Sequence, residues 1–318
     1  MATRSVTVIP HPSSFILCAA LLAALVGGCA RIPTGVTPIK AQNTEQLQKQ
    51  LQDRAPSLDQ FRVRGPFGVE QSSDLVITLP GGERVTADLY LSNAPGKLPL
   101  VILMHGYDNT KADHAYQAFH VASWGMHSLA ISLPTRARWQ GNGRSLTGLV
   151  NTIQRRPEVL DPRIDTSRII IAAHSFGAIS TSVALAEGAP AMGGILLDPA
   201  AIGKEVPGFI RRINKPLMVV GADPRVSVAR ERDNFFRFAR GGVTEVSIKG
   251  AAHEDAQFPM GGGLMSFASG TTEEYQLTFV AALTAAAFSL SSYGTFDYAW
   301  RSFRPGLDSG KLINPRRK

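Results

Sequence analysis

Cysteine is almost absent from this chain of 318 residues. The two cysteines, Cys18 and Cys29, both lie within the first 29 residues. A domain built from the rest of the chain therefore has neither a disulfide nor a cysteine metal site. Its stability has to come from side-chain packing, and 44% of the residues are apolar, which is enough to form a core.

The apolar run near the start of the chain lacks the length of a membrane-spanning helix. It reads "FILCAALLAALVGG" (15–28) and follows Arg4 and a polar beginning, which is typical of a secretory signal. The run ends in "LVGGC", which resembles a bacterial lipobox and predicts a lipid on Cys29. Residues 1–28 are thus expected to be a signal peptide, and the alternative is an ordinary signal peptide cut nearby. We expect an exported lipoprotein, anchored to a membrane on its periplasmic face or at the cell surface.

Acidic residues are fewer than basic ones, and the net charge is +8, or +7 once residues 1–28 are removed. The sequence has no zinc-finger, helix-turn-helix or aromatic RNA-binding pattern, and its basic residues are scattered. Nucleic-acid binding is therefore not expected. The positive charge favours anionic surfaces such as lipid headgroups.

The chain divides by composition into a polar start, a globular part and a short tail. Residues 29–60 are polar and proline-bracketed, and we interpret them as the lipidated N-terminus and a tether. Residues 61–292 form the predicted catalytic domain. Residues 293–318, ending in "NPRRK", show no clear periodicity and are expected to be an irregular basic tail.

Strand and helix patterns alternate through the central part. A hairpin is expected from "DLVITLP" and "RVTADLYL" around a Gly-Gly turn. Further strands are predicted at 98–104, 127–133, 168–173, 193–197, 216–221 and 243–249, and helices near 113–124, 145–155, 176–187, 228–240 and 272–290. Because the first five of these strands are almost wholly apolar, the fold class is α/β, with a mostly parallel central sheet and helices on both faces.

Ser175 lies in "RIIIAAHSFGAIS", at the junction of a predicted strand and a predicted helix. A nucleophile elbow needs small residues two before and two after the serine, and Ala173 and Gly177 fill these places. The usual pattern has Gly where Ala173 stands. The alternative interpretation of Ser175 is a helix N-cap.

A serine nucleophile needs a general base and groups that stabilise an oxyanion. His253, in "KGAAHEDAQF", is the one histidine that follows Ser175 in the sequence, and it is the candidate base. His105 and Gly106, in "HGYDN", follow the first long strand, so their loop is expected to approach the serine and the substrate. The backbone N–H groups of Tyr107 and Phe176 are the expected oxyanion donors.

These motifs, with "GGILLDPAA", resemble the α/β-hydrolase superfamily over about residues 61–290. Within it the chain is similar to the branch of chlorophyllases, platelet-activating-factor acetylhydrolases and dienelactone-hydrolase-like esterases. The resemblance implies hydrolysis of carboxylic esters, lipid-like esters among the candidates, through a serine acyl-enzyme. It implies no metal and no organic cofactor. It does not give the substrate.

The triad acid has two candidates. Asp223 resembles the common arrangement, in "DPRV" after the strand at 216–221. Asp198 resembles the chlorophyllase and acetylhydrolase arrangement, and its intervals of 23 residues from Ser175 and 55 to His253 suit that branch. We favour Asp198 and interpret Asp223 as a turn or N-cap carboxylate.

Two loops are candidates for shaping the substrate pocket. One is "PTRARWQGNGR" (134–144), which offers Arg136, Arg138 and Trp139, and the other is "FPMGGGLMSF" (258–267), a candidate lid. The first is equally consistent with a solvated connector. Two other functions remain open: a catalytically inactive hydrolase-like lipoprotein that binds a partner or ligand, and an amidase or peptidase of the same fold.

Overall fold

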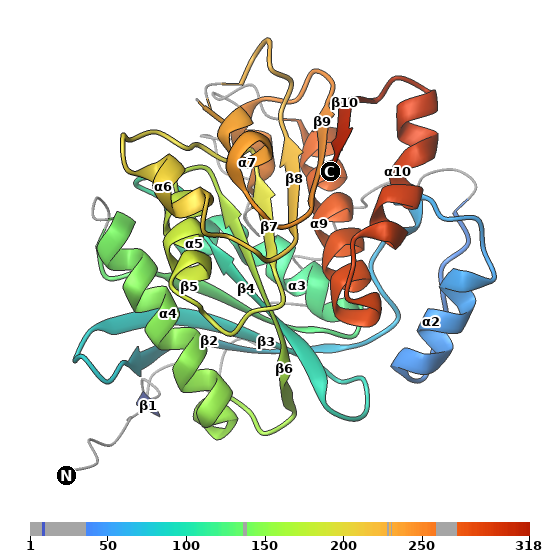
Figure 1. The fold of residues 1–318 in the computed structure, drawn as a ribbon. Coiled ribbons are helices and arrows are strands. Elements are labelled where there is room, and N and C mark those ends of the chain that lie inside the picture. The colour runs from blue at the N-terminus through green and yellow to red at the C-terminus, as the bar shows by residue number, and fades with distance from the viewer. Residues whose placement is uncertain (1–7, 10–35, 136–138, 228, 230, 259–271) are drawn as a thin grey trace.

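The structure is a computed structural model, and it describes residues 8–9, 36–135, 139–227, 229, 231–258 and 272–318 (Figure 1). These residues do not include Cys29, Arg136, Arg138, nearly all of the candidate lid, or the expected signal peptide apart from Val8 and Ile9. The predictions made for them stay predictions.

A ten-stranded sheet forms the centre of the described part, in the order β1-β2-β3-β5-β4-β6-β7-β8-β9-β10. The strands are β1 (Val8–Ile9), β2 (Val69–Thr78), β3 (Arg84–Ser92), β4 (Leu98–Met104), β5 (His127–Ser132), β6 (Ile164–His174), β7 (Gly194–Leu197), β8 (Leu217–Gly221), β9 (Val243–Ile248) and β10 (Leu312–Arg317). Pairing is parallel from β5 through β9 and antiparallel at both edges. The predicted α/β architecture with a mostly parallel sheet is confirmed.

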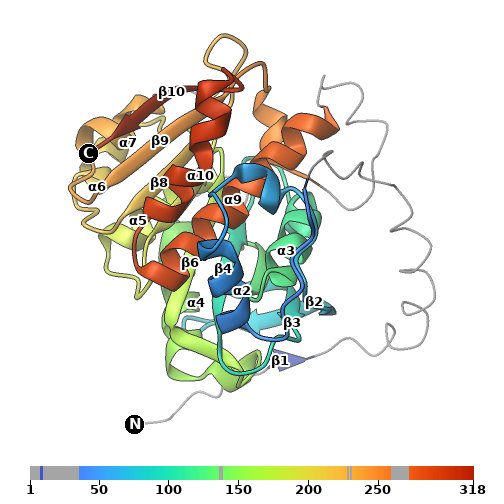
Figure 2. The same cartoon turned by 90° about the vertical axis from the view of Figure 1, so that its right-hand side faces the viewer.

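Helices pack on both faces of the sheet, as two-sided burial of its strands requires. One face carries α4 (Trp139–Arg155), α5 (Gly177–Ala186), α6 (Val206–Ile210) and α7 (Asp233–Phe238). The other carries α2 (Thr44–Gln52), α3 (Ala115–Ser123), α9 (Glu273–Tyr293) and α10 (Asp297–Asp308), which lie together in Figure 2. Alternate residues of β4 point to opposite cores, Leu100 and Ile102 to the first and Val101 and Leu103 to the second.

The order of the central strands creates the place for a site. After β4 the chain goes to β5 on one side and then, through α4, to β6 on the other. Such a reversal opens a crevice at the carboxyl ends of the two strands, where ligands bind in open α/β sheets. The loop after β4 and the turn after β6, which carries Ser175, both lie at this edge.

The expected polar tether is folded over residues 36–60. Residues 44–52 form α2, capped by Asn43, and Leu58–Phe61 form the 3-10 helix η1. The side chains of Leu47, Leu51 and Phe61 are completely buried. A few apolar residues at helical spacing are enough here because a hydrophobic surface of the domain is available to cover them.

The prediction of an irregular tail is wrong. Residues 297–308 form α10, which buries Tyr298 and Phe303, and residues 312–317 form β10, antiparallel to β9. α10 is polar on average and contains Pro305, and both features argue against a helix by composition although its apolar residues recur at helical spacing. Packing of the Tyr298 ring near the rings of Phe61 and Phe288 stabilises α10 against the rest of the fold.

Several helix boundaries differ from the predicted ones. The helix expected at 145–155 begins at Trp139, so part of the loop expected at 134–144 is helical, and the helix expected at 228–240 is shortened to 233–238. α9 is long and apolar enough to cross a membrane by length and composition, yet 83% of its apolar window is buried within the fold. It is therefore arranged as a core helix.

Candidate active site

Ser175 forms a tight turn between β6 and α5. Its φ angle is 52°, in the left-handed region that non-glycine residues rarely adopt. Three backbone hydrogen bonds fix the turn: the Ser175 N–H donates to the Leu197 carbonyl, and the Ser175 carbonyl accepts from Ala178 and Ala200, all at 3.1 Å. A strained conformation held this firmly is typical of a functional residue.

Small residues let the loop after β4 touch this turn. A Cβ atom on Gly177 would lie 2.5 Å from the His105 carbonyl oxygen, and one on Gly106 would lie 2.9 Å from Ser175 Cβ. Both distances are shorter than real contacts allow. Glycine at these positions is thus required by the close approach of the two segments, which the sequence pattern predicted for Gly177.

Ser175, His253 and Asp198 form a continuous hydrogen-bonded chain. Ser175 Oγ lies 2.8 Å from His253 Nε2, and His253 Nδ1 lies 2.6 Å from Asp198 Oδ2. All three residues are buried, and Asp198 is fully so. With Nδ1–H donating to the carboxylate, Nε2 is free to accept the serine proton, which is the arrangement of a serine nucleophile with its base and orienting acid.

The Asp198 carboxylate has several donors besides His253. Its Oδ1 accepts from the Ala222 N–H at 2.9 Å and from Arg232 Nη1 at 2.7 Å, and its Oδ2 accepts from Ser227 Oγ at 2.5 Å. Burial alone would raise the pKa of Asp198. The hydrogen bonds from His253 and Ser227 and the charge of Arg232 outweigh it and hold that pKa below its ordinary value.

Asp223, the alternative acid, has different partners. Its oxygens accept from the backbone N–H and the guanidinium of Arg225, at 3.0 and 2.7 Å, and from the Gly250 N–H at 2.9 Å. The Arg225 hydrogen bonds are the main reason that the pKa of Asp223 lies well below its usual range. The structure thus brings Asp198 to His253 and uses Asp223 as a turn carboxylate.

Hydrogen bonds hold the loop that carries His253 in place on both sides. His253 opens the 3-10 helix η4 (His253–Ala256), and the buried carboxylate of Asp255 accepts from the N–H groups of Ala252 and Thr272, at 2.7 and 2.8 Å. Gln257 Oε1 accepts from Asn109 Nδ2 at 2.6 Å. The "HGYDN" and "HEDAQF" motifs, which lie about 150 residues apart, therefore meet beside the triad.

His174 is a neighbour of His253 that the sequence analysis did not single out. Its ring lies 4.5 Å from the His253 ring between centroids, and its Nε2 donates to the His253 carbonyl at 3.2 Å. Burial is the main cause that holds the pKa of His174 well below its ordinary value, so the ring stays neutral. Its place directly before Ser175 was the available signal.

The predicted oxyanion donors lie in the two segments that touch. Phe176 directly precedes α5, where N–H groups have no carbonyl one turn earlier, and Tyr107 follows Gly106, which packs on Ser175. His105 is buried, and its Nδ1 lies 2.7 Å from the Gly106 carbonyl oxygen. His105 therefore contacts the loop backbone.

An aromatic surface lies next to the serine. Trp139 stacks on Phe176 with ring centroids 5.2 Å apart, and the 59% exposed Tyr107 lies 6.1 Å from Phe176 and 6.4 Å from Trp139. Rings of this kind suit an apolar part of a substrate. Trp139 was predicted as a substrate contact, and the structure places it within this cluster.

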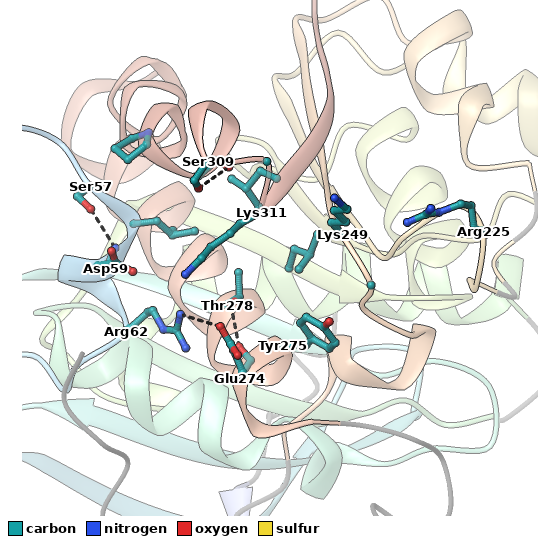
Figure 3. Close-up of a pocket in the computed structure, with 17 residues that line it drawn as sticks. Ser57, Asp59, Arg62, Arg225, Lys249, Glu274, Tyr275, Thr278, Ser309 and Lys311 are labelled. Carbon is teal, nitrogen blue, oxygen red and sulfur yellow. Dashed lines mark hydrogen bonds and ion pairs between the residues drawn. The ribbon is translucent and has the colours of Figure 1, made fainter. Parts of the chain in front are cut away.

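Two cavities lie around the described part of the chain. One of about 400 Å³ lies beside the loop after β4 and is lined by His105, Asn109 and Lys111 among others. Another, of about 640 Å³, lies between η1, α9, α10 and the ends of β9 and β10, with Arg62, Lys249 and Lys311 in its wall (Figure 3). None of Ser175, His253 and Asp198 lines the larger cavity.

A scan against known protein families finds no match to this chain, and a search of curated proteins finds none either. The class of protein is therefore judged from the geometry of Ser175, His253 and Asp198 and from the sheet that carries them.

Gly106 offers a test of the close approach between its loop and the serine. Gly106→Ala is expected to lower kcat roughly 10-fold or more and stability by about 1–3 kcal/mol, because the new methyl group collides with Ser175 and His174. The measurement is ester turnover together with the melting temperature. Gly208→Ala is the matched control, since a Cβ atom there meets nothing within 4 Å. Equal turnover in Gly106→Ala and wild type would show that this approach has no part in catalysis.

Proposed function

We propose that this protein is a serine hydrolase that cleaves carboxylic esters through an acyl-enzyme. The observation that carries the proposal is the chain Ser175 Oγ–His253–Asp198, with distances of 2.8 and 2.6 Å, on a strand-to-helix turn with positive φ. A structural N-cap serine needs neither a buried imidazole nor a carboxylate behind it.

The proposed reaction has two halves. Ser175 Oγ attacks the ester carbonyl carbon while His253 Nε2 takes its proton, and the oxyanion is stabilised by the N–H groups of Tyr107 and Phe176. The tetrahedral intermediate collapses, the ester C–O bond breaks, and the imidazolium gives its proton to the leaving alcohol. Water then repeats the sequence on the acyl-enzyme and releases the acid and free Ser175.

The α/β-hydrolase fold is part of the same proposal. It is supported by the order serine, acid, histidine along the chain and by the position of all three after parallel strands, namely Ser175 after β6, Asp198 after β7 and His253 after β9. The place of the acid after β7 is also what the resemblance to chlorophyllases and acetylhydrolases implies.

A panel of aryl esters with increasing acyl length tests the proposed activity. We expect turnover by the domain lacking residues 1–28, with a preference among acyl chains set by the surface formed by Tyr107, Trp139 and Phe176. The corresponding anilides distinguish an esterase from an amidase. A correctly folded domain that turns over neither series and resists acylation of Ser175 would instead be an inactive binding protein.

We also propose that the protein is exported and held at a membrane by a lipid on Cys29, which lies outside the described residues. Cys29→Ser is expected to move the protein from the membrane fraction to the soluble fraction, because it removes the atom that carries the lipid. Radiolabelled palmitate measures the modification directly. The absence of label from the wild-type protein would leave an ordinary secreted enzyme.

A further inference from the structure

We infer that Arg232 is a positioning residue for the triad acid, and that it acts as the centre of a buried charge network reaching the C-terminal strand β10. The inference rests on the proposed function, because it assigns Asp198 to the triad. Arg232 lies directly before α7. It contacts Asp198, which follows β7, and Glu245 and Ser247, which both lie on β9. It does not touch the reacting atoms.

The contacts of Arg232 use most of its guanidinium. Nη1 donates to Asp198 Oδ1 at 2.7 Å and to the Ala222 carbonyl at 3.1 Å, Nη2 donates to Ser247 Oγ at 2.9 Å, and Nε lies 3.4 Å from Glu245 Oε1. The side chain is only 12% exposed. A planar group with several donors in fixed directions is suited to hold a carboxylate in one orientation.

The end of β8 leaves space for the Arg232 guanidinium. A Cβ atom on Gly221 would lie 1.9 Å from Arg232 Nη1, so the guanidinium occupies the space that any other residue would fill at the end of β8. Glycine at residue 221, two residues before Asp223, leaves this space open. The absence of a side chain at residue 221 is thus matched to the presence of an arginine at residue 232.

The charges continue beyond Arg232. Glu245 on β9 is 2% exposed and pairs with Arg232 and with Arg316 Nη2, the latter at 2.6 Å, and Arg316 on β10 also pairs with Asp233. Acids and bases therefore alternate from Asp198 to the surface. Since β10 supplies Arg316, the strand at the C-terminal end of the chain is connected to the triad by a line of ion pairs.

Two effects on the acid follow. The positive charge of Arg232 favours ionised Asp198, and the bond to Oδ1 turns Oδ2 toward His253, where Ser227 also donates to it. The groups that face Asp198 are thus His253, Arg232 and Ser227, and those that face Arg232 and Glu245 are Asp198, Arg316 and Asp233. Loss of the Arg232 guanidinium removes a positive charge beside the hydrogen-bonded Asp198–His253 unit, so this unit should bind a proton at a higher pH and activity should fall at a higher pH as the solution is acidified.

Three variants distinguish the effect of the Arg232 charge from the effect of its fixed hydrogen-bond donors. Arg232→Lys keeps the charge but not the fixed donors, so we expect kcat to fall about 10-fold with the acidic limb of kcat/KM unchanged. The double variant Arg232→Met with Glu245→Gln removes the two charges that pair with each other, so Glu245 is not left without Arg232, and Asp198 keeps its bonds from Ala222, Ser227 and His253. We expect kcat to fall about 100-fold and the acidic limb to move to higher pH. Arg225→Met is the matched control, since it removes the Asp223 pair, whose arginine side chain is 72% exposed.

The measurements are pH profiles of kcat/KM, the fraction of active serine titrated with a fluorophosphonate, and the melting temperature of each variant. A double variant that folds and keeps both the wild-type kcat and the wild-type acidic limb overturns the role of Arg232 while leaving the proposed function intact. An acidic limb that moves equally in Arg225→Met overturns it as well. A wild-type protein that neither reacts with the fluorophosphonate nor hydrolyses esters overturns the proposed function and this inference with it.

Discussion

Replacing Ser175 with alanine is expected to abolish labelling by a fluorophosphonate probe and to lower kcat for ester hydrolysis by about 10⁶-fold. The reason is that Ser175 Oγ, 2.8 Å from His253 Nε2, is the atom that forms the acyl-enzyme in the proposed mechanism. The measurement is gel fluorescence of the probe adduct together with turnover of an aryl ester. Stability should change little, since only one oxygen atom is removed.

Ser182→Ala is the matched control for this experiment. Ser182 is also buried in α5, and its hydroxyl donates to the Ala178 carbonyl at 2.7 Å, so it tests the loss of a serine hydroxyl without the loss of the nucleophile. We expect full labelling of this variant. Equal labelling of wild type and Ser175→Ala would show that another residue reacts with the probe, and the assignment of Ser175 would be wrong.

Replacing Asp198 with asparagine is expected to lower kcat by about 10⁴-fold while the fold is kept. The carboxylate accepts from His253 Nδ1 at 2.6 Å, so it fixes the tautomer in which Nε2 can accept the serine proton and it stabilises the imidazolium that forms. An asparagine nitrogen at this place would present a donor to the ring. Turnover and the melting temperature are to be measured on the same preparation.

Asp223→Asn separates the two candidate acids. Its carboxylate is 1% exposed and accepts from Arg225 and from the Gly250 N–H, with no contact to His253. We therefore expect nearly normal turnover and a loss of stability of about 1–3 kcal/mol, seen as a fall in melting temperature. If Asp223→Asn instead abolished turnover while Asp198→Asn kept most of it, the acid would act from the strand β8 side, as in the common arrangement. The geometry around His253 would then have to change during catalysis.

The core of the fold could be predicted from the sequence because its signals are local. Apolar runs such as 98–104 and 168–173 coincide with β4 and β6 to within a few residues, and the helix after Ser175 begins where the small residues of the turn end. The elements at the edge of the fold could not be predicted in this way. α10 is polar on average and contains Pro305, and most of β10 is not buried. Both form because Tyr298, Phe303 and Leu312 find apolar surface or a strand edge built by other segments.

Some residues of the candidate site could likewise be predicted from the sequence, and others could not. Ser175 and His253 were identified by spacing and chain order, since a strand-to-helix turn with small neighbours is a local pattern and only one histidine follows it. The choice between Asp198 and Asp223 remained a preference, because both end strands at the same edge of the sheet. Ser227 and Arg232 contact Asp198 and carry no pattern that distinguishes them from ordinary residues, and His174 is marked only by its place directly before Ser175.

The sequence by itself determined the alternation of strands and helices, the sharp turn at Ser175 and the scarcity of cysteine, all of which depend on residues near one another in the chain. Only the tertiary structure decided which carboxylate meets His253, because the direction of a side chain at a strand end depends on the donors that surround it. For Asp198 these donors come from Ala222, Ser227 and Arg232, and for Asp223 from Arg225 and Gly250. Contacts of this kind join segments that are far apart in sequence, and no local pattern encodes them.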